Sequence, residues 1–230
     1  MTMTSLGRTV RIATVAAIAS CALAGTAAAA PVFGANNFAG GNWGGYVSFG
    51  SFTTVTAGWT EPSVTCNSTN DLFAPWVGID GDGSSTVEQA GVATDCSSGA
   101  PVYQAWYEMY PAPPVYYDNP VDAGDKITAT VSRTATSTYR LVITDTTKGW
   151  TRSVTKSLSA KHSSAEAVIE SPTDSYPAIN GGVRFTGVEF NGAALATAAP
   201  SAVDADDRGA YTWSPSAIAA DGTDFTVTRH

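Results

Sequence analysis

The chain has 230 residues, of which only 14% are charged, and its formal net charge at pH 7 is −8. Because 20 acidic residues stand against 12 basic ones, nucleic acid and anionic membrane surfaces are poor partners for it. Hydrophobic residues make up 43% of the chain, enough to bury one sizeable core, so we expect a single folded domain.

Residues 1–30 have the three-part pattern of an export signal. Arg8 and Arg11 give a positive start, residues 12–24 are mostly small and apolar, and an alanine run at 27–30 suits signal peptidase. We therefore predict a secreted, extracellular protein from which residues 1–30 are removed. The mature chain would keep 10 basic and 20 acidic residues, a formal charge of −10.

One alternative concerns Cys21. The segment 18–21 resembles a lipoprotein cleavage box, which would leave a lipid on Cys21 and attach the protein to a membrane. We favour plain secretion, because the alanine-rich stretch that follows reads as an ordinary cleavage region. Without that lipid we expect no stable membrane association.

Residues 31–42 form an irregular lead-in, and we assign residues 43–230 to the folded domain. This domain is a succession of short runs rich in Val, Ile, Thr and aromatic residues, separated by Gly, Pro, Asn and Asp. The pattern predicts an all-β antiparallel sandwich or barrel. Only the alanine-rich stretch 192–199 has a helical period. The predicted strands are 45–48, 55–60, 74–79, 86–92, 102–110, 126–132, 139–145, 150–158, 165–169, 183–190 and 225–228.

Two cysteines, Cys66 and Cys96, remain after removal of the signal. An even pair in an oxidising compartment predicts a disulfide, which for a loop of this size contributes roughly 3–4 kcal/mol in the chain-entropy model. A metal site would need nearby His or further Cys, which the sequence lacks. We therefore expect neither a metal nor another cofactor.

Alternation along the predicted strands groups several polar side chains, because successive side chains point to opposite faces of a sheet. Glu166 and Glu170 share one face of their strand, and Glu108 shares a face with Trp106. Gln89 lies among small and apolar residues on its own strand. These groups sit in aliphatic or aromatic surroundings rather than in charged runs.

The sequence lacks the motifs of several common catalytic and metal-binding sites. A Ser-His-Asp triad would have to use His162, and no Gly-x-Ser-x-Gly elbow accompanies it, so we interpret His162 as a solvated loop residue. No His-Glu-x-x-His is present, and the Asp80–Gly83 segment lacks the ligand spacing of a calcium loop and is read as a tight turn. A carboxylate that acts as general base and an amide that donates to an oxyanion remain possible. The residues alone do not select which Glu and which Gln.

Seven segments, taken together and in order, resemble the glutamic peptidase (eqolisin) family, and in particular its bacterial members. The resemblance covers nearly all of the predicted mature chain. It implies a sandwich of two curved antiparallel sheets, related to the concanavalin-type jelly roll, with the active site in a concave groove. The segments are Asn42–Tyr46, Trp59–Pro62, Trp76–Gly81, Val87–Val92, Tyr103–Pro111, Gly124–Asp125 and Ser164–Glu170.

The same resemblance implies an acid endopeptidase that needs no metal. Its catalytic pair falls on Gln89 and Glu170: Glu170 would activate water as general base and then act as acid, and Gln89 would stabilise the oxyanion. We expect a monomer that acts on proteins or peptides. The positions that the resemblance indicates as supporting the pair or contacting substrate are Trp43, Trp76, Asp80 and Glu108.

The chain departs from the family at four positions near the site. Ala167 stands where many members have Trp, Ser171 where fungal members have Asp, and Ala93 and Gln104 where fungal members have acids. These departures concern the acid optimum and the subsite preference more than the reaction.

Two other functions fit the sequence. A retaining glycosidase would need a second carboxyl about 5–5.5 Å from the first, which Glu108 or Glu166 would supply. A sugar-binding module without catalysis would instead stack sugars on its Trp and Tyr side chains, and would lose no activity on removal of one acid.

Overall fold

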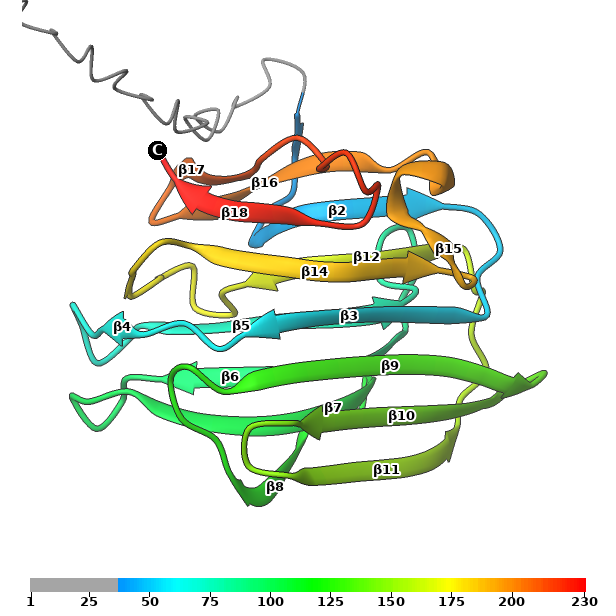
Figure 1. Cartoon of the computed structure of the whole chain (residues 1–230), viewed down its shortest axis with the longest axis horizontal. Coiled ribbons are helices and arrows are strands. Elements are labelled where there is room, and N and C mark those ends of the chain that lie inside the picture. Colours follow the sequence, from blue (N-terminus) through cyan, green and yellow to red (C-terminus); the bar gives the residue numbers. More distant parts are fainter. Residues whose placement is uncertain (1–36) are drawn as a thin grey trace, which may run out of the picture. The chain divides into compact units, whose positions relative to one another are not determined.

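The computed structural model in Figure 1 describes residues 37–230. The predicted export signal, the Cys21 alternative and residues 31–36 of the lead-in lie outside the described residues. Almost every strand pairing is antiparallel, and η1 (Leu195–Ala198), a single turn of 3-10 helix, is the one helical element of the described part. None of this part forms a helix with the length and hydropathy of a membrane-spanning segment.

Seven strands form the sheet that carries the site, here called sheet 1. The pairs β16–β2, β2–β12 and β12–β5 join strands that are distant in sequence, so half of the sheet is assembled by long-range pairing. In spatial order its strands are β16 (Ser201–Asp207), β2 (Trp43–Phe49), β12 (Ser164–Glu170), β5 (Leu72–Ile79), β6 (Val87–Asp95), β7 (Val102–Tyr110) and β8 (Val115–Pro120).

The second sheet, sheet 2, lies against one face of sheet 1, and Figure 1 shows its strands in front of those of sheet 1. β16 pairs with β2 of sheet 1 and with β17 of sheet 2, so it joins the two sheets along one edge. The strands of sheet 2 are β11 (Trp150–Ser157), β10 (Thr138–Asp145), β9 (Lys126–Ala135), β3 (Thr54–Thr60), β14 (Val183–Phe190), β18 (Phe225–Arg229) and β17 (Ala210–Pro215).

Four strands of two residues complete the fold. β1 (Phe38–Ala39) pairs with β16 and is parallel to it, and β15 (Ala193–Ala194) pairs with β14. β4 (Val64–Thr65) and β13 (Ala178–Ile179) pair with each other outside the two large sheets.

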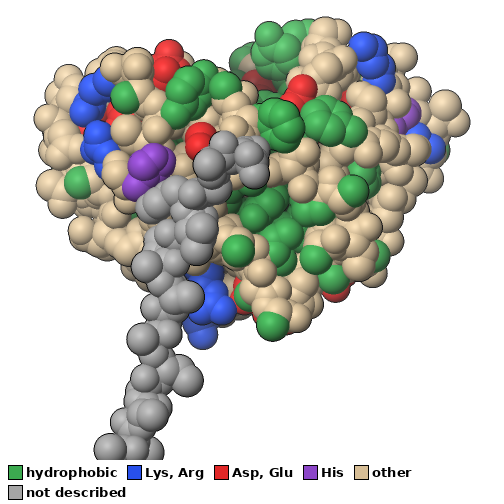
Figure 2. Space-filling view, turned by 90° about the horizontal axis from the view of Figure 1, so that it is seen from above, with side chains coloured by type: hydrophobic (Ala, Val, Ile, Leu, Met, Phe, Trp, Pro, Cys, Tyr) green, Lys and Arg blue, Asp and Glu red, His purple; other side chains and the backbone are tan. Residues whose placement is uncertain are grey.

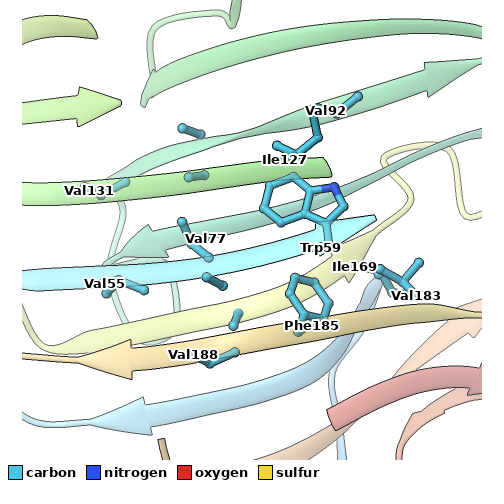
Figure 3. Close-up of a cluster of buried hydrophobic side chains, with 14 of the residues drawn as sticks. Val55, Trp59, Val77, Val92, Ile127, Val131, Ile169, Val183, Phe185 and Val188 are labelled. Atoms are coloured by element: carbon cyan, nitrogen blue, oxygen red, sulfur yellow. The ribbon is translucent and has the colours of Figure 1, made fainter. Parts of the chain in front are cut away.

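The main core fills the space between the sheets. Figure 3 shows Trp59 and Ile127 from sheet 2 lying together with Val92 and Ile169 from sheet 1. β9 and β10 alternate between buried and exposed residues for much of their length, as expected of strands with one face on a core. β5 and β12 are buried along nearly their whole length, because a second apolar cluster covers the other face of sheet 1.

The prediction of an all-β antiparallel sandwich is confirmed, and so is the Cys66–Cys96 disulfide, whose Cα atoms lie 5.6 Å apart. Three longer strands, β8, β16 and β17, were not predicted, and neither were the two-residue strands β1, β4, β13 and β15. The helical expectation for residues 192–199 holds for only half of the stretch: Leu195–Ala198 form the single 3-10 turn η1, and Ala193–Ala194 form β15.

Candidate active site

A hollow of about 550 Å³ opens on the face of sheet 1 that points away from sheet 2. Its floor is formed by strands β12, β5, β6 and β7, and its wall by the loops at their ends. The hollow brings together the two residues of the predicted catalytic pair. Its lining residues are Asn42, Trp43, Leu72, Ala74, Gly81, Ser84, Val87, Gln89, Ala93, Trp106, Glu108, Tyr110, Pro114, Tyr116, Glu170 and Pro172.

Glu170 is the last residue of β12 and lies at the edge of this hollow. Asn42 Nδ2 donates a hydrogen bond to Glu170 Oε1 at 2.9 Å, and Trp76 Nε1 donates one to Glu170 Oε2 at 2.9 Å. Burial raises the pKa of the Glu170 carboxyl, and hydrogen bonds from Trp43, Asn42 and Trp76 act against that rise. Both carboxylate oxygens are thus held in place by side chains of neighbouring strands and of the turn before β2.

Trp76 reaches Glu170 from beneath the hollow. Its side chain is fully buried, and its ring packs edge-on against Trp43, with ring centroids 5.0 Å apart. Opposite it on β6 stands Gly91, where an added Cβ would lie 2.6 Å from Trp76 Cβ and 2.4 Å from the Pro75 carbonyl oxygen. The glycine therefore leaves the space that the indole needs to direct its N–H at Glu170.

Gln89 lies on β6, directly opposite Glu108 on β7. Its Nε2 donates a hydrogen bond to Glu108 Oε2 at 2.5 Å, and its Oε1 is buried without a partner in the described part of the chain. A carboxamide has two N–H donors, so one remains available to a bound molecule. Burial raises the pKa of Glu108, the Gln89 hydrogen bond lowers it, and the charge of Glu170 raises it.

The remaining wall of the hollow is apolar. Leu72, Ala93 and Trp106 line its floor, and Tyr110 and Tyr116 stand half-exposed at its rim. None of the lining residues is Lys, Arg or His. The hollow therefore combines two carboxyls, of Glu108 and Glu170, and two amides, of Asn42 and Gln89, with a hydrophobic wall.

Asp80 supports the site from outside the hollow. It is fully buried, has a φ of 65°, and accepts hydrogen bonds from the backbone N–H of His162 at 2.7 Å and of Ser163 at 2.8 Å. These bonds fasten the loop that leads into β12. Asp80 therefore fixes the strand that carries Glu170 and does not reach the groove itself.

Two other residues lie elsewhere than the sequence suggested. Glu166 shares a strand face with Glu170 but is fully buried and does not line the hollow. His162 does lie in a loop, as expected, but it is half-buried rather than solvated: its ring packs on Tyr139 with centroids 5.8 Å apart, and its Nε2 is buried. Within residues 37–230, no three His, Cys, Asp or Glu side chains are grouped as metal ligands.

Similarity to known proteins agrees with this arrangement. The Peptidase A4 family profile matches residues 41–228, which is most of the chain. The chain belongs to the Peptidase A4 family. The resemblance to glutamic peptidases that the sequence motifs indicated is thereby confirmed.

Two Peptidase A4 relatives show partial sequence similarity. Aspergillopepsin-2 of Aspergillus niger is 33% identical over 140 residues, which cover 51% of this chain and 49% of that protein. Scytalidopepsin B of Scytalidium lignicola is 35% identical over 138 residues, covering 56% of this chain and 51% of that protein. The chain thus spans about half the length of both relatives.

Solved structures extend the likeness to the fold. Scytalido-glutamic peptidase with a transition state analog inhibitor superposes with a TM-score of 0.71 at 24% identity, covering 82% of this chain and 98% of that one. Aspergilloglutamic peptidase from Aspergillus niger gives a TM-score of 0.57 at 27% identity, covering 70% of this chain and 99% of that one. The two-sheet architecture is therefore shared with these peptidases.

The structure adds one residue that the sequence interpretation missed. Asn42 was noted only as the start of a motif, yet its side chain holds Glu170 and its carbonyl oxygen accepts a hydrogen bond from the Tyr176 hydroxyl at 2.9 Å. The only signal in the sequence was its position directly before Trp43.

Of the departures from the family, Ala93 lines the hollow, and Ser171 is buried and bonded to the backbone N–H of Ser175.

Proposed function

We propose that this chain is a glutamic-type endopeptidase that hydrolyses peptide bonds in the hollow of sheet 1, with Glu170 and Gln89 as its catalytic residues. The observation that carries this proposal is the arrangement of Glu170. Two side-chain donors orient its carboxylate at the edge of the same hollow into which the Gln89 amide faces. Membership of the Peptidase A4 family supports the same reaction.

The proposed reaction begins with water bound beside Glu170. Glu170 takes a proton from this water as the oxygen attacks the carbonyl carbon of the scissile peptide bond. The carbonyl oxygen becomes negative and accepts a hydrogen bond from the free N–H of Gln89, which stabilises the transition state. Glu170 then delivers its proton to the departing nitrogen, the C–N bond breaks, and a carboxylic acid and an amine are released.

Glu108 has a positioning role in this scheme. By accepting one N–H of Gln89 at 2.5 Å it turns the amide nitrogen, rather than the amide oxygen, toward the reacting carbonyl. Trp76 and Asn42 likewise have a positioning role, because each donates a hydrogen bond to the Glu170 carboxylate. Their hydrogen bonds favour the ionised carboxylate, which is the form that acts as a base, and so they extend activity toward acid pH.

Peptides are the proposed substrates. A structure of scytalido-glutamic peptidase contains a peptide-based transition state analog, and one of the peptidase SCP-B contains the tripeptide Ala-Ile-His. The apolar wall of the hollow suits hydrophobic side chains near the scissile bond. An export signal at residues 1–30 would place this activity outside the cell.

The test is hydrolysis of an unstructured protein such as casein across acid and neutral pH, with pepstatin and a chelator present. Wild type should be active in acid, whereas Glu170→Gln and Gln89→Ala should be inactive. Glu189→Gln is the matched control, because Glu189 is exposed on β14 of sheet 2. A folded wild-type protein without proteolysis at any pH would overturn the proposal.

A further inference from the structure

A second hollow, of about 330 Å³, adjoins the first and shares Asn42, Trp43 and Gly81 with it. It lies toward the β2 and β16 side of sheet 1, whereas the first hollow lies toward β8. Because the two hollows share part of their lining, the second lies directly beside a peptide bound in the first. The other residues that line the second hollow are Ala39, Gly40, Gly41, Val47, Asp82 and Val203.

Asp82 is the one charged side chain that lines this second hollow. Its main-chain oxygen is fixed by a hydrogen bond from Ser164 Oγ at 3.3 Å, but within residues 37–230 its half-buried carboxylate receives neither a hydrogen bond nor an ion pair. Lys161 lies near the same turn, yet its Nζ donates to the Gly83 carbonyl oxygen at 3.0 Å and forms no ion pair. Within the described fold, the carboxylate thus lacks a cation.

The absence of a cation beside the Asp82 carboxylate follows from how the basic residues are distributed over the fold. No Lys or Arg occurs between residues 12 and 125, and the strands of sheet 1 contain no Lys, Arg or His. The basic residues that lie in strands belong to sheet 2, on β9, β10, β11, β14 and β18. Figure 2 views the molecule from above Figure 1, and on this side Lys and Arg side chains form only a few separate groups.

We infer that the second hollow is a distal subsite that binds a basic side chain of the substrate, with the Lys or Arg of the bound peptide paired to Asp82. This inference rests on the proposed peptidase function and specifies its substrate class. Trp43 lies between the two hollows, and its indole offers an apolar surface to the aliphatic stem of that Lys or Arg. Half-buried charge pairs of this kind discriminate among partners because the unpaired alternative leaves a carboxylate partly desolvated.

The experiment uses a set of peptides that share one cleavable sequence, with a single Lys moved along the positions on both sides of the scissile bond. A matched set carries Gln in place of Lys. We expect kcat/KM to favour Lys over Gln by about two- to fivefold at one position only, the range of a partly exposed ion pair. Asp82→Asn should remove the preference, and about 0.5 M salt should weaken it.

Asp118→Asn is the control variant, because it removes the same charge from an exposed position on β8 of the same sheet but outside both hollows. It should leave the preference intact. Hydrolysis without a Lys preference, or a preference that survives in Asp82→Asn, would overturn the subsite and leave the peptidase function standing.

A second readout separates the two proposals when no peptide is cleaved. Binding of the Lys and Gln peptides to Glu170→Gln and to Glu170→Gln/Asp82→Asn is measured by fluorescence anisotropy. Tighter binding of the Lys peptide that depends on Asp82 would support the subsite even if hydrolysis fails. Equal binding of both peptides to both variants would overturn it.

Discussion

Two glutamates of this protein, Glu170 and Glu61, each accept a hydrogen bond from an indole N–H, but only Glu170 lines the hollow of the candidate active site. Trp76 Nε1 donates to Glu170 at 2.9 Å at the edge of the groove, and Trp59 Nε1 donates to Glu61 at 2.9 Å in the interior. Glu61 also accepts a hydrogen bond from the Thr94 hydroxyl at 3.2 Å and is fully buried. Glu170 borders the first hollow, whereas Glu61 lines neither of the two hollows described above.

Burial raises the pKa of both carboxyls. For Glu61 it raises the pKa to about 8, against the opposing hydrogen bonds from Trp59 and Thr94. A raised pKa and an indole donor therefore do not distinguish a catalytic carboxyl from a structural one. What distinguishes Glu170 is access to a substrate-sized space and a neighbouring amide, Gln89, in that space.

The largest expected effect comes from exchanging each glutamate for glutamine. Glu170→Gln removes the general base and should lower kcat/KM on a peptide substrate by roughly 10²–10⁴-fold. Glu61→Gln should leave kcat/KM within about twofold of wild type at a pH where both proteins are folded, because Glu61 touches no part of the groove. Steady-state kinetics on both variants measure the difference.

Circular dichroism confirms that each variant is folded before its kinetics are compared. Equal losses of activity in the two folded variants would contradict a catalytic role for Glu170 and a structural role for Glu61. Full activity in Glu170→Gln would remove Glu170 from the mechanism altogether.

The second expected effect is a pH dependence of the free energy of unfolding, and it comes mainly from Glu61. Between its ordinary pKa of 4.5 and its folded-state pKa of about 8, the folded protein keeps a proton that the unfolded chain has released. The free energy of unfolding therefore falls as pH rises through this window, by about 5 kcal/mol for one such group. Glu88, whose pKa burial also raises to about 8, adds to the same trend.

Chemical denaturation at a series of pH values from about 4 to about 8 tests this trend. Wild type should be most stable at the acid end, and Glu61→Gln should show a clearly shallower fall, since it has no proton to lose. Glu189→Gln, at an exposed position, should reproduce the wild-type slope. An identical slope in Glu61→Gln and wild type would mean that Glu61 is not protonated in the fold.

A smaller effect is expected from Asn42→Ala. Loss of the Asn42 hydrogen bond leaves Glu170 less well oriented and should lower kcat by about tenfold, equivalent to about 1.4 kcal/mol. Because that bond lowers the pKa of Glu170, its removal should also shift the acid limb of the pH–kcat/KM profile to higher pH. Asn37→Ala is the control, since Asn37 donates to Asp204 instead. An unshifted acid limb would show that Asn42 has no electrostatic influence on Glu170.

The smallest effect is expected from Tyr176→Phe. The Tyr176 hydroxyl donates to the Asn42 carbonyl oxygen at 2.9 Å, and its loss leaves that oxygen with the longer hydrogen bond from the Ser171 backbone N–H, at 3.2 Å. We expect a loss of about 1 kcal/mol in stability, the usual net value of one hydrogen bond. The loss of activity should be smaller than in Asn42→Ala, and thermal unfolding together with kinetics measures both. An activity lower than that of Asn42→Ala would contradict this order.

Much of the fold is readable in the sequence, because most strands are short alternating runs of Val, Thr and aromatic residues. β8 and β16 were missed for a local reason: prolines crowd the start of β8, and three aspartates interrupt β16. β16 owes its structure to pairing with the distant strand β2, and β8 to pairing with β7, the strand before it. Local propensity does not contain that information.

The site was less accessible to sequence reasoning. Gln89 and Glu170 were selected by family resemblance, since nothing local indicates that β5 will lie between β6 and β12 and bring them to one hollow. Asn42 lies 128 positions from Glu170 in the chain, so their contact has no signature in either segment. Asp80 was expected among the groove positions, and only the structure shows that it acts through the loop before β12.

The strand β16 has a consequence for how the molecule opens. β16 pairs with strands of both sheets, so backbone hydrogen bonds join the two sheets along that edge. At the opposite edge, between β8 and β11, the sheets are joined through side chains. There Arg152 Nε donates to Asn119 at 2.5 Å and Trp150 Nε1 donates to the Pro120 carbonyl oxygen at 2.9 Å. The free edge is the one that carries the aromatic rim of the groove. Local opening there would move the rim of the groove while the pairing along β16 stays intact, and amide hydrogen exchange should accordingly be faster along β8 and β11 than along β2 and β16.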